Sequence, residues 1–244
     1  MQAEVAEGVR RLTQGVTNFY LIEESGKFTL VDAGTPGDWD FFCRSIGSIA
    51  QLADLDAVLL THAHPDHVGI AEKARTGADA RIWIHGADAE SARTGKTGKK
   101  DGSIASYLLR AEFYRTLFSL TRRGATKMIP VKEVSSFADG ETIDVPGRPR
   151  AGHAPGHTPG SAVLLLERRR VLFTGDVMAT KNPLIGRPGP QIMPSGLNED
   201  SAEALRSLDV MRDMPADVLF PGHGDPWTQG AAEAVGRAKA AGRS

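Results

Sequence analysis

The segment Thr61-His62-Ala63-His64-Pro65-Asp66-His67 places four side chains of metal-ligand type within six positions. Imidazole and carboxylate are the ligands of catalytic zinc sites, which keep one coordination position open. His62 and His64 are two residues apart, so in an extended turn they point to the same side. Asp66 and His67 follow directly and can face a neighbouring metal ion. We therefore interpret this segment as a metal-binding turn.

Three later segments repeat this arrangement, because each places a ligand-type residue in a turn at one end of an apolar run. His157 lies in the turn at 154–161 before one run, and Asp176 and His223 follow the runs at 171–174 and 217–220. In α/β folds, loops at the strand ends bring side chains from distant parts of the sequence together. We expect these residues to meet the first cluster, which itself follows the apolar run at 57–60.

The hydrophobic periodicity predicts a layered α/β sandwich of two similar halves. We predict one domain over residues 1–244, with a helical insertion at about 88–125 near the active site and a mobile polar loop at 88–102. The predicted strands are 16–22, 28–31, 57–60, 81–84, 142–145, 162–166, 171–174 and 217–220, and the predicted helices are 39–52, 68–76, 104–123, 201–211 and 231–241.

Composition narrows the class of protein. The 244 residues carry a net charge of -1, which gives no electrostatic reason to expect a nucleic acid or an anionic membrane as partner. The single cysteine excludes an intrachain disulfide. We see no signal peptide and no transmembrane run, and we expect a cytoplasmic protein that acts on a small molecule.

The combination of these turns resembles the metallo-β-lactamase-fold hydrolase superfamily, over nearly the whole chain. The resemblance implies an αββα sandwich with two Zn²⁺ ions at one edge, with iron or manganese as alternative metals. One ion would bind to His62, His64 and His157, and the other to Asp66, His67 and His223, with Asp176 between them. Two zinc ions roughly 3.5–4 Å apart can hold a bridging hydroxide that attacks an electrophilic centre. Asp66 is the candidate catalytic residue, orienting the hydroxide or carrying a proton.

The identity of residue 176 separates branches of this superfamily. True β-lactamases of the fold usually carry Cys or Ser where Asp176 stands, so antibiotic hydrolysis is disfavoured. The chain ends about twenty residues after His223, too early for the C-terminal extension of glyoxalase II. Acyl-homoserine lactonases commonly use a Tyr between the last two histidine ligands, and none follows Tyr114 here. We predict hydrolysis of a small ester, lactone or thioester, with a phosphodiesterase and a mononuclear iron persulfide dioxygenase as alternatives.

Two segments are candidates for the walls of the substrate pocket. The predicted helix at 104–123 has a wide apolar surface and could offer Tyr107, Phe113 or Tyr114 to a substrate, or could form a homodimer contact. The Pro- and Gly-rich segment at 181–196 could offer Arg187 or Gln191. Asp32 and Thr61 flank the site at strand ends and are interpreted as residues that support the ligands or shape the turns. His153, four residues before His157, could orient a ligand, with plain loop packing as the alternative. His85 is assigned a structural role.

Overall fold

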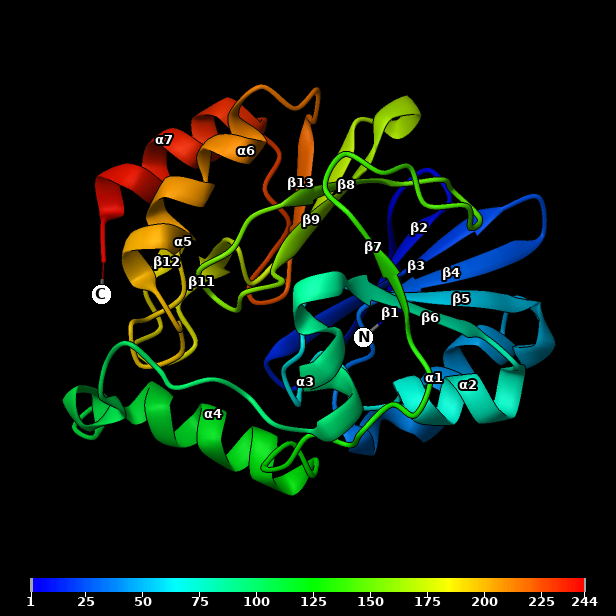
Figure 1. Ribbon diagram of the computed structural model, residues 1–244, viewed down its shortest axis with the longest axis horizontal. Helices are drawn as coiled ribbons and strands as arrows, with labels where there is room; N and C mark the ends of the chain where they lie inside the picture. Colours follow the sequence, from blue (N-terminus) through cyan, green and yellow to red (C-terminus); the bar gives the residue numbers. More distant parts are fainter. Residues whose placement is uncertain (1, 244) are drawn as a thin grey trace.

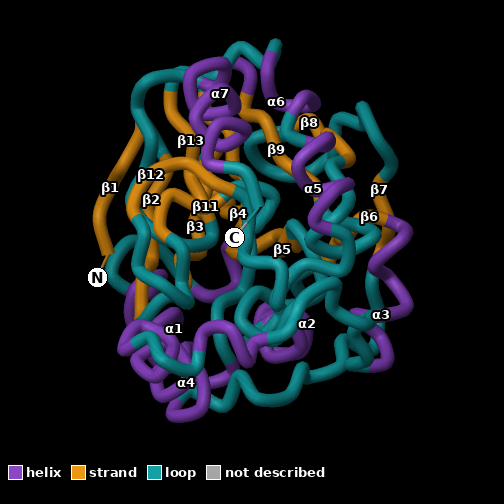
Figure 2. Tube along the Cα trace, turned by 90° about the vertical axis from the view of Figure 1, so that its left-hand side faces the viewer, coloured by secondary structure: helices purple, strands orange, loops and turns teal. Residues whose placement is uncertain are grey.

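The computed structural model describes residues 2–243, which form two β-sheets packed face to face with helices on both outer faces (Figure 1). The layers run helix, sheet, sheet, helix. In Figure 2, α6 and α7 lie at one end of the molecule and α1 and α2 at the other, with the strands between them. The predicted αββα sandwich is confirmed.

The first sheet has seven strands within the described residues, in the order β1-β2-β3-β4-β5-β6-β7. The strands β4 to β7 are parallel to one another, whereas β1 to β4 pair as antiparallel neighbours. The strands are β1 (Gln2–Ala6), β2 (Val9–Gln14), β3 (Thr17–Glu24), β4 (Lys27–Val31), β5 (Leu55–Leu60), β6 (Arg81–His85) and β7 (Ser135–Phe137).

The second sheet has the order β13-β10-β9-β8, and a separate hairpin pairs β11 with β12. The strand β10 is parallel to β13 and antiparallel to β9. The carboxyl ends of β10 and β13 and the amino end of β9 therefore share one edge. The strands are β8 (Arg150–His153), β9 (Ala162–Leu166), β10 (Val171–Gly175), β11 (Ala179–Lys181), β12 (Pro188–Gln191) and β13 (Val218–Pro221).

Helices cover the two outer faces. The α-helices are α1 (Trp39–Gly47), α2 (Ala71–Ala78), α3 (Ala89–Thr94), α4 (Ala111–Arg122), α5 (Ser201–Ser207), α6 (Asp209–Arg212) and α7 (Ala231–Ala241). Short 3₁₀ turns occur at Pro36–Asp38, Leu52–Asp54, Gly86–Asp88, Ile104–Tyr107 and Glu167–Arg169. Among residues 2–243, none of these helices has the length and apolar character that crossing a membrane requires.

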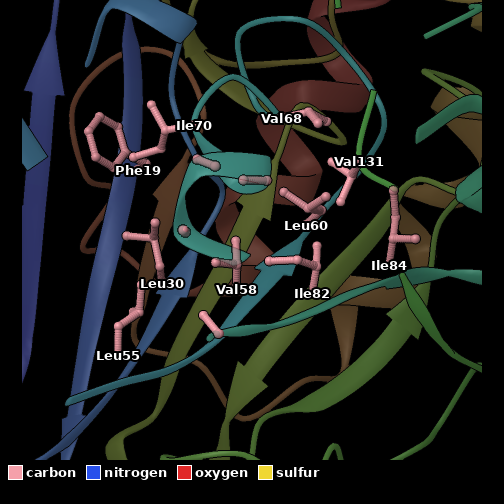
Figure 3. Close-up of a cluster of buried hydrophobic side chains, with 14 of the residues drawn as sticks. Phe19, Leu30, Leu55, Val58, Leu60, Val68, Ile70, Ile82, Ile84 and Val131 are labelled. Atoms are coloured by element: carbon pink, nitrogen blue, oxygen red, sulfur yellow. The ribbon is translucent and has the colours of Figure 1, made fainter. Parts of the chain in front are cut away.

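Strand alternation divides the core into three layers of apolar contacts. In β5, Val58 and Leu60 face α1, α2 and α3, whereas Ala57 and Leu59 face the second sheet. Figure 3 shows Val58, Leu60 and Ile82 side by side, with Ile70 beside Phe19. The outer face of the second sheet packs on α5, α6 and α7. Burying such a side chain contributes roughly 1.5–3 kcal/mol, so these apolar layers stabilise the sheets whose edge carries the ligands.

The single helix predicted over residues 104–123 is wrong. A 3₁₀ turn at Ile104–Tyr107 is followed by extended backbone at Arg110, and the α-helix begins at Ala111. In a continuous helix, Tyr107 and Phe113 would point in different directions, because six residues span about 600°. The break lets both side chains pack on Leu184 and leaves Leu109 fully exposed, at 98%.

Several other element predictions are also wrong in detail. Residues 142–145 form no strand, because Val145 N donates to Ile143 O in a tight turn. The amides of Gly69 and Ile70 donate to Gly34 O and Ala33 O, so α2 begins only at Ala71. The helix predicted at 39–52 ends at Gly47, the one at 201–211 divides at Leu208, and the loop at 88–102 contains α3. The edge strand β1 and its neighbour β2 were not predicted at all.

Candidate metal centre

The ligand-type residues meet at one edge of the sandwich, where four strands deliver their turns. The first cluster follows β5, Asp176 follows β10, His223 follows β13, and the His157 turn leads into β9. Gly175 has a φ of +47°, and a Cβ there would lie 2.3 Å from Thr61 Oγ1, so only glycine allows the two sheets to approach here. The shared edge brings together residues separated by as many as 161 positions in the chain, from His62 to His223.

One group consists of His62, His64 and His157, all three buried. His64 Nδ1 lies 2.8 Å from His157 Nε2. A second group consists of Asp66, His67 and His223, in which Asp66 Oδ2 lies 3.5 Å from His223 Nε2 and 3.9 Å from His67 Nε2. The ligand atoms within each group lie within 4.8 Å of one another, which suits a single ion in each.

The carboxylate of Asp176 lies between the two groups. Its Oδ2 is 3.5 Å from His157 Nε2 in the first group and 3.3 Å from His223 Nε2 in the second, and its Oδ1 is 3.5 Å from His67 Nε2. A Cβ on Gly222 would lie 2.3 Å from Asp176 Oδ1, so glycine at this position keeps the space open. Asp176 therefore has the position that a bridging ligand needs.

Unpartnered buried atoms test whether these residues fit a metal. His62 Nε2, His67 Nε2 and Asp176 Oδ1 are buried, and none has a hydrogen-bond partner among the described residues. A buried polar atom without a partner costs about 1–3 kcal/mol. All three atoms point into the same cluster, where a cation would satisfy them together. The donor set therefore fits a divalent metal ion.

A second layer of residues fixes the orientation of the imidazole rings. Asp32 Oδ2 lies 2.9 Å from His67 Nδ1, Asn198 Oδ1 lies 2.9 Å from His157 Nδ1, and Val16 O lies 2.7 Å from His223 Nδ1. Each of these oxygens accepts a hydrogen bond from the Nδ1–H group, which leaves the lone pair on Nε2 directed at the centre. The predicted supporting role of Asp32 agrees with this geometry.

The pKa shifts divide the histidines into two kinds. Burial lowers the pKa of His157 to about 4 and lowers the pKa of His62 and His64 well below the usual value. Burial acts in the same direction on His67 and His223, but the neighbouring carboxylates, with Asp176 the strongest of them, together raise the pKa of both. A bound metal would compete with protons for these two rings.

Two residues of the centre were not predicted from the sequence. Asn198 holds His157 from a loop 41 residues away, and Lys100 Nζ lies 2.7 Å from His64 Nε2. Lys100 belongs to the segment predicted as a mobile loop. Gly98 N and Asp101 N bond to Glu199 and Asn198, which holds that segment against the site. Neither residue stands in a motif, so no local pattern indicates its role.

The other predicted residues have different surroundings. Tyr107 is buried with Phe113 and Leu184, whereas Tyr114 is 54% exposed. Gln191 accepts from Arg187 Nε and donates to Arg187 O and Gly189 O. Substrate contact stays a prediction for all four of these residues, Tyr107, Tyr114, Arg187 and Gln191.

The two remaining histidines pair with each other. The rings of His85 and His153 stack with centroids 3.9 Å apart, and His153 Nε2 donates to Pro159 O at 2.8 Å. The ring of His157 is held instead by Asn198, so the expected supporting role of His153 at the ligands is wrong.

A cavity of about 450 Å³ lies beside His223 and Gly224. Its lining comes from the β2–β3 hairpin, from α4 and from the segment that follows β11. The two segments predicted as pocket walls thus contribute to it, through residues other than those singled out. The lining residues are Arg11, Thr13, Gly15, Val16, Asn18, Glu112, Arg115, Thr116, Ser119, Lys181, Pro183, His223, Gly224 and Asp225.

Comparisons with known proteins agree with the geometry. Residues 12–223 match the metallo-beta-lactamase superfamily. Two proteins of Bacillus subtilis (strain 168) are similar over most of their length. YobT is 31% identical over 85% of this chain and 82% of its own, and the probable metallo-hydrolase YflN is 28% identical over 92% and 87%.

A solved structure shows the same fold. The metallo-beta-lactamase family protein TTHA1429 from Thermus thermophilus aligns with a TM-score of 0.71 and 24% identity, over 98% of this chain and 80% of its own. The family match covers far more than half of the chain and includes all seven candidate ligands. This chain belongs to the metallo-β-lactamase superfamily.

Proposed function

We propose that this chain is a metal-dependent hydrolase that binds two divalent metal ions and cleaves a small ester, lactone or thioester. The position of Asp176 supports this most directly, because its carboxylate is 3.3–3.5 Å from ligand nitrogens of both groups. The relative YflN is described as a probable metallo-hydrolase, which agrees with this class of activity.

The ligand types favour particular metals. His62, His64 and His157 would hold one ion, Asp66, His67 and His223 the other, and Asp176 would bind both. Imidazole with carboxylate suits zinc, and it also suits iron or manganese. Two such ions, when bound, would supply a hydroxide nucleophile at neutral pH and polarise the substrate oxygen.

Asp66 has the contacts of a residue that handles a proton. Thr17 Oγ1 donates to its Oδ2 at 3.1 Å, which fixes the carboxylate and leaves Oδ1 to act. The side chain of Asp66 is 15% exposed, whereas that of Asp176 is only 3% exposed. We assign to Asp66 the task of orienting the attacking water and accepting its proton at Oδ1.

The cavity beside His223 is the proposed substrate site. Its volume of about 450 Å³ lies within the usual range for small-molecule pockets, roughly 300–1,000 Å³. Its lining combines apolar surface with hydroxyl and charged side chains, among them Thr116 and Ser119 on α4 and Lys181, which pairs with Glu112 of the same helix. A site of this kind can bury the apolar part of a small ester and hydrogen-bond to its polar atoms.

Metal analysis and a substrate panel test this proposal. We expect about two divalent ions per chain, and hydrolysis of aryl esters, lactones or thioesters that stops after chelation and returns when zinc is added. About one iron per chain with consumption of oxygen would instead support a persulfide dioxygenase. Turnover confined to bis-aryl phosphates would support the phosphodiesterase alternative.

A further inference from the structure

Asp88 joins the two turns that carry the first group of ligands. It lies in the turn Gly86–Asp88 between β6 and α3 and is 1% exposed. Its Oδ2 accepts from Ala63 N at 2.8 Å and from Thr158 Oγ1 at 2.7 Å, and its Oδ1 accepts from Gly160 N at 2.7 Å. One carboxylate therefore holds together two turns, one after β5 of the first sheet and one before β9 of the second.

These partners are immediate neighbours of the candidate ligands. Ala63 lies between His62 and His64, and Thr158 directly follows His157. We propose that Asp88 is the positioning residue of the first group: its carboxylate fixes the turn of His62 and His64 against the turn of His157, so that all three imidazoles meet one metal ion. This inference rests on the proposed function, in which that group binds a metal.

An ordinary structural role does not account for these contacts. Asp88 immediately precedes α3, where an aspartate commonly caps the helix, but its side chain makes no capping bond there. Its oxygens bond instead to residues 25, 70 and 72 positions away. The fit is also close, because a Cβ on Gly160 would lie 2.6 Å from the Cβ of Asp88.

The second group has supports that do not involve Asp88. Asp32 orients His67, and the carbonyl of Val16 orients His223. Loss of the Asp88 carboxylate should therefore weaken one metal site and spare the other. A residue that only stabilised the fold would not produce such a difference between the two sites.

The test is Asp88→Asn, titrated with Zn²⁺ alone in competition with a chromophoric chelator. Asparagine has nearly the same shape, but its amide nitrogen must face Ala63 N or Gly160 N, so at least one backbone donor loses its acceptor. Replacing such an outer partner typically weakens metal affinity 10–100-fold. We expect Asp88→Asn to lose zinc affinity by that factor at the first group, which is identified as the binding step that His157→Ala removes. At the second group, identified as the step that His223→Ala removes, the affinity should change by less than about threefold.

Asp38→Asn is the matched control. Asp38 is also fully buried and accepts from Thr35 N, Thr35 Oγ1 and Arg123, but it holds a turn that carries no ligand. We expect this variant to lower thermal stability while both zinc affinities stay as in the wild type. If Asp88→Asn keeps wild-type affinity in both steps, or if both variants weaken both steps equally, the proposal is wrong.

Hydrogen exchange in the metal-free protein gives an independent result. The amides of Ala63 and Gly160 should exchange faster in Asp88→Asn than in the wild type, and unchanged rates would overturn the proposed contacts. A wild-type protein that binds no zinc would refute the proposed function. The exchange rates would still test whether Asp88 holds the two turns, because they are measured without metal.

Discussion

Replacement of Asp176 by asparagine should weaken both metal sites at once. The carboxylate lies 3.3–3.5 Å from nitrogens of His157, His67 and His223, so it is shared between the two groups. Asparagine keeps the shape of the side chain and removes its charge. A variant that lacks one histidine ligand should mainly lower the affinity of one metal site. This contrast distinguishes a bridging ligand from a ligand that binds a single ion.

The structure gives the size of the effect. The carboxylate oxygens of Asp176 lie 3.3–3.5 Å from the imidazole nitrogens of His223 and His67. Opposite unit charges at such a separation attract by about 5 kcal/mol at an effective dielectric constant of about 20. If relaxation and water recover half of this, roughly 2.5 kcal/mol is lost, which corresponds to about a 60-fold weaker affinity. Because the carboxylate reaches both groups, we expect a loss of at least that size in both binding steps.

The assay is zinc titration against a chelator, followed by turnover of the best substrate in the panel. Asp217→Asn is the control, because it removes a carboxylate from an exposed ion pair with Arg170. That control should leave affinity and turnover unchanged. Two zinc ions bound to Asp176→Asn with wild-type affinity, or a loss confined to one step, would refute the bridging assignment.

Three further predictions concern stability and assembly. The metal-free protein should be most stable near pH 6.5. Below this pH the free energy of unfolding falls, because the pKa of the buried His157 is lowered to about 4 and its ring takes up a proton more readily in the unfolded chain. Above this pH it falls again, because the pKa values of His67 and His223 are raised in the folded protein and their stabilising protons are then lost. Urea denaturation at pH 5, 6.5 and 8.5 with a chelator measures this, and a steady rise in stability toward pH 8.5 contradicts it. Leu60 is fully buried and directly precedes the ligand turn. Leu60→Ala should lower the free energy of unfolding by roughly 2–5 kcal/mol, and a loss below about 1 kcal/mol would contradict the tight packing around this side chain. We also predict a homodimer through the apolar face of α4, where Phe118 is 66% exposed: Phe118→Glu should reduce the mass in sedimentation equilibrium from two chains to one of 26.1 kDa, and a wild-type monomer would contradict the contact.

The ligand types could be read from the sequence because each stands in a recognisable local pattern. An apolar run followed by a turn with His or Asp marks a strand end, and strand ends of one sheet share an edge. The strand β9 and the helix α7 have the predicted bounds, because the continuous apolar run of β9 and the helical spacing of apolar residues in α7 both reflect burial directly. Elements whose sequence is less periodic, such as the edge strand β1 and its neighbour β2, were not predicted.

Hydrogen bonds between distant segments could not be predicted in this way. Asn198 and Lys100 reach the ligand histidines from loops without a motif, and the break after Tyr107 depends on Leu184, which lies 77 positions later. Such contacts depend on how the two sheets and their loops pack. Local propensity carries no information about that packing.

The sequence by itself determined the chemistry of the centre, because the turns of His62 to His67, His157, Asp176 and His223 contain the donor atoms that a divalent metal requires. Only the tertiary structure decided how those atoms are shared. The parallel pairing of β10 with β13 places Asp176 beside His223, and the close approach at Gly175 brings it to the first cluster. A bridge between two ions is a property of distances across the sheets, and folding sets those distances.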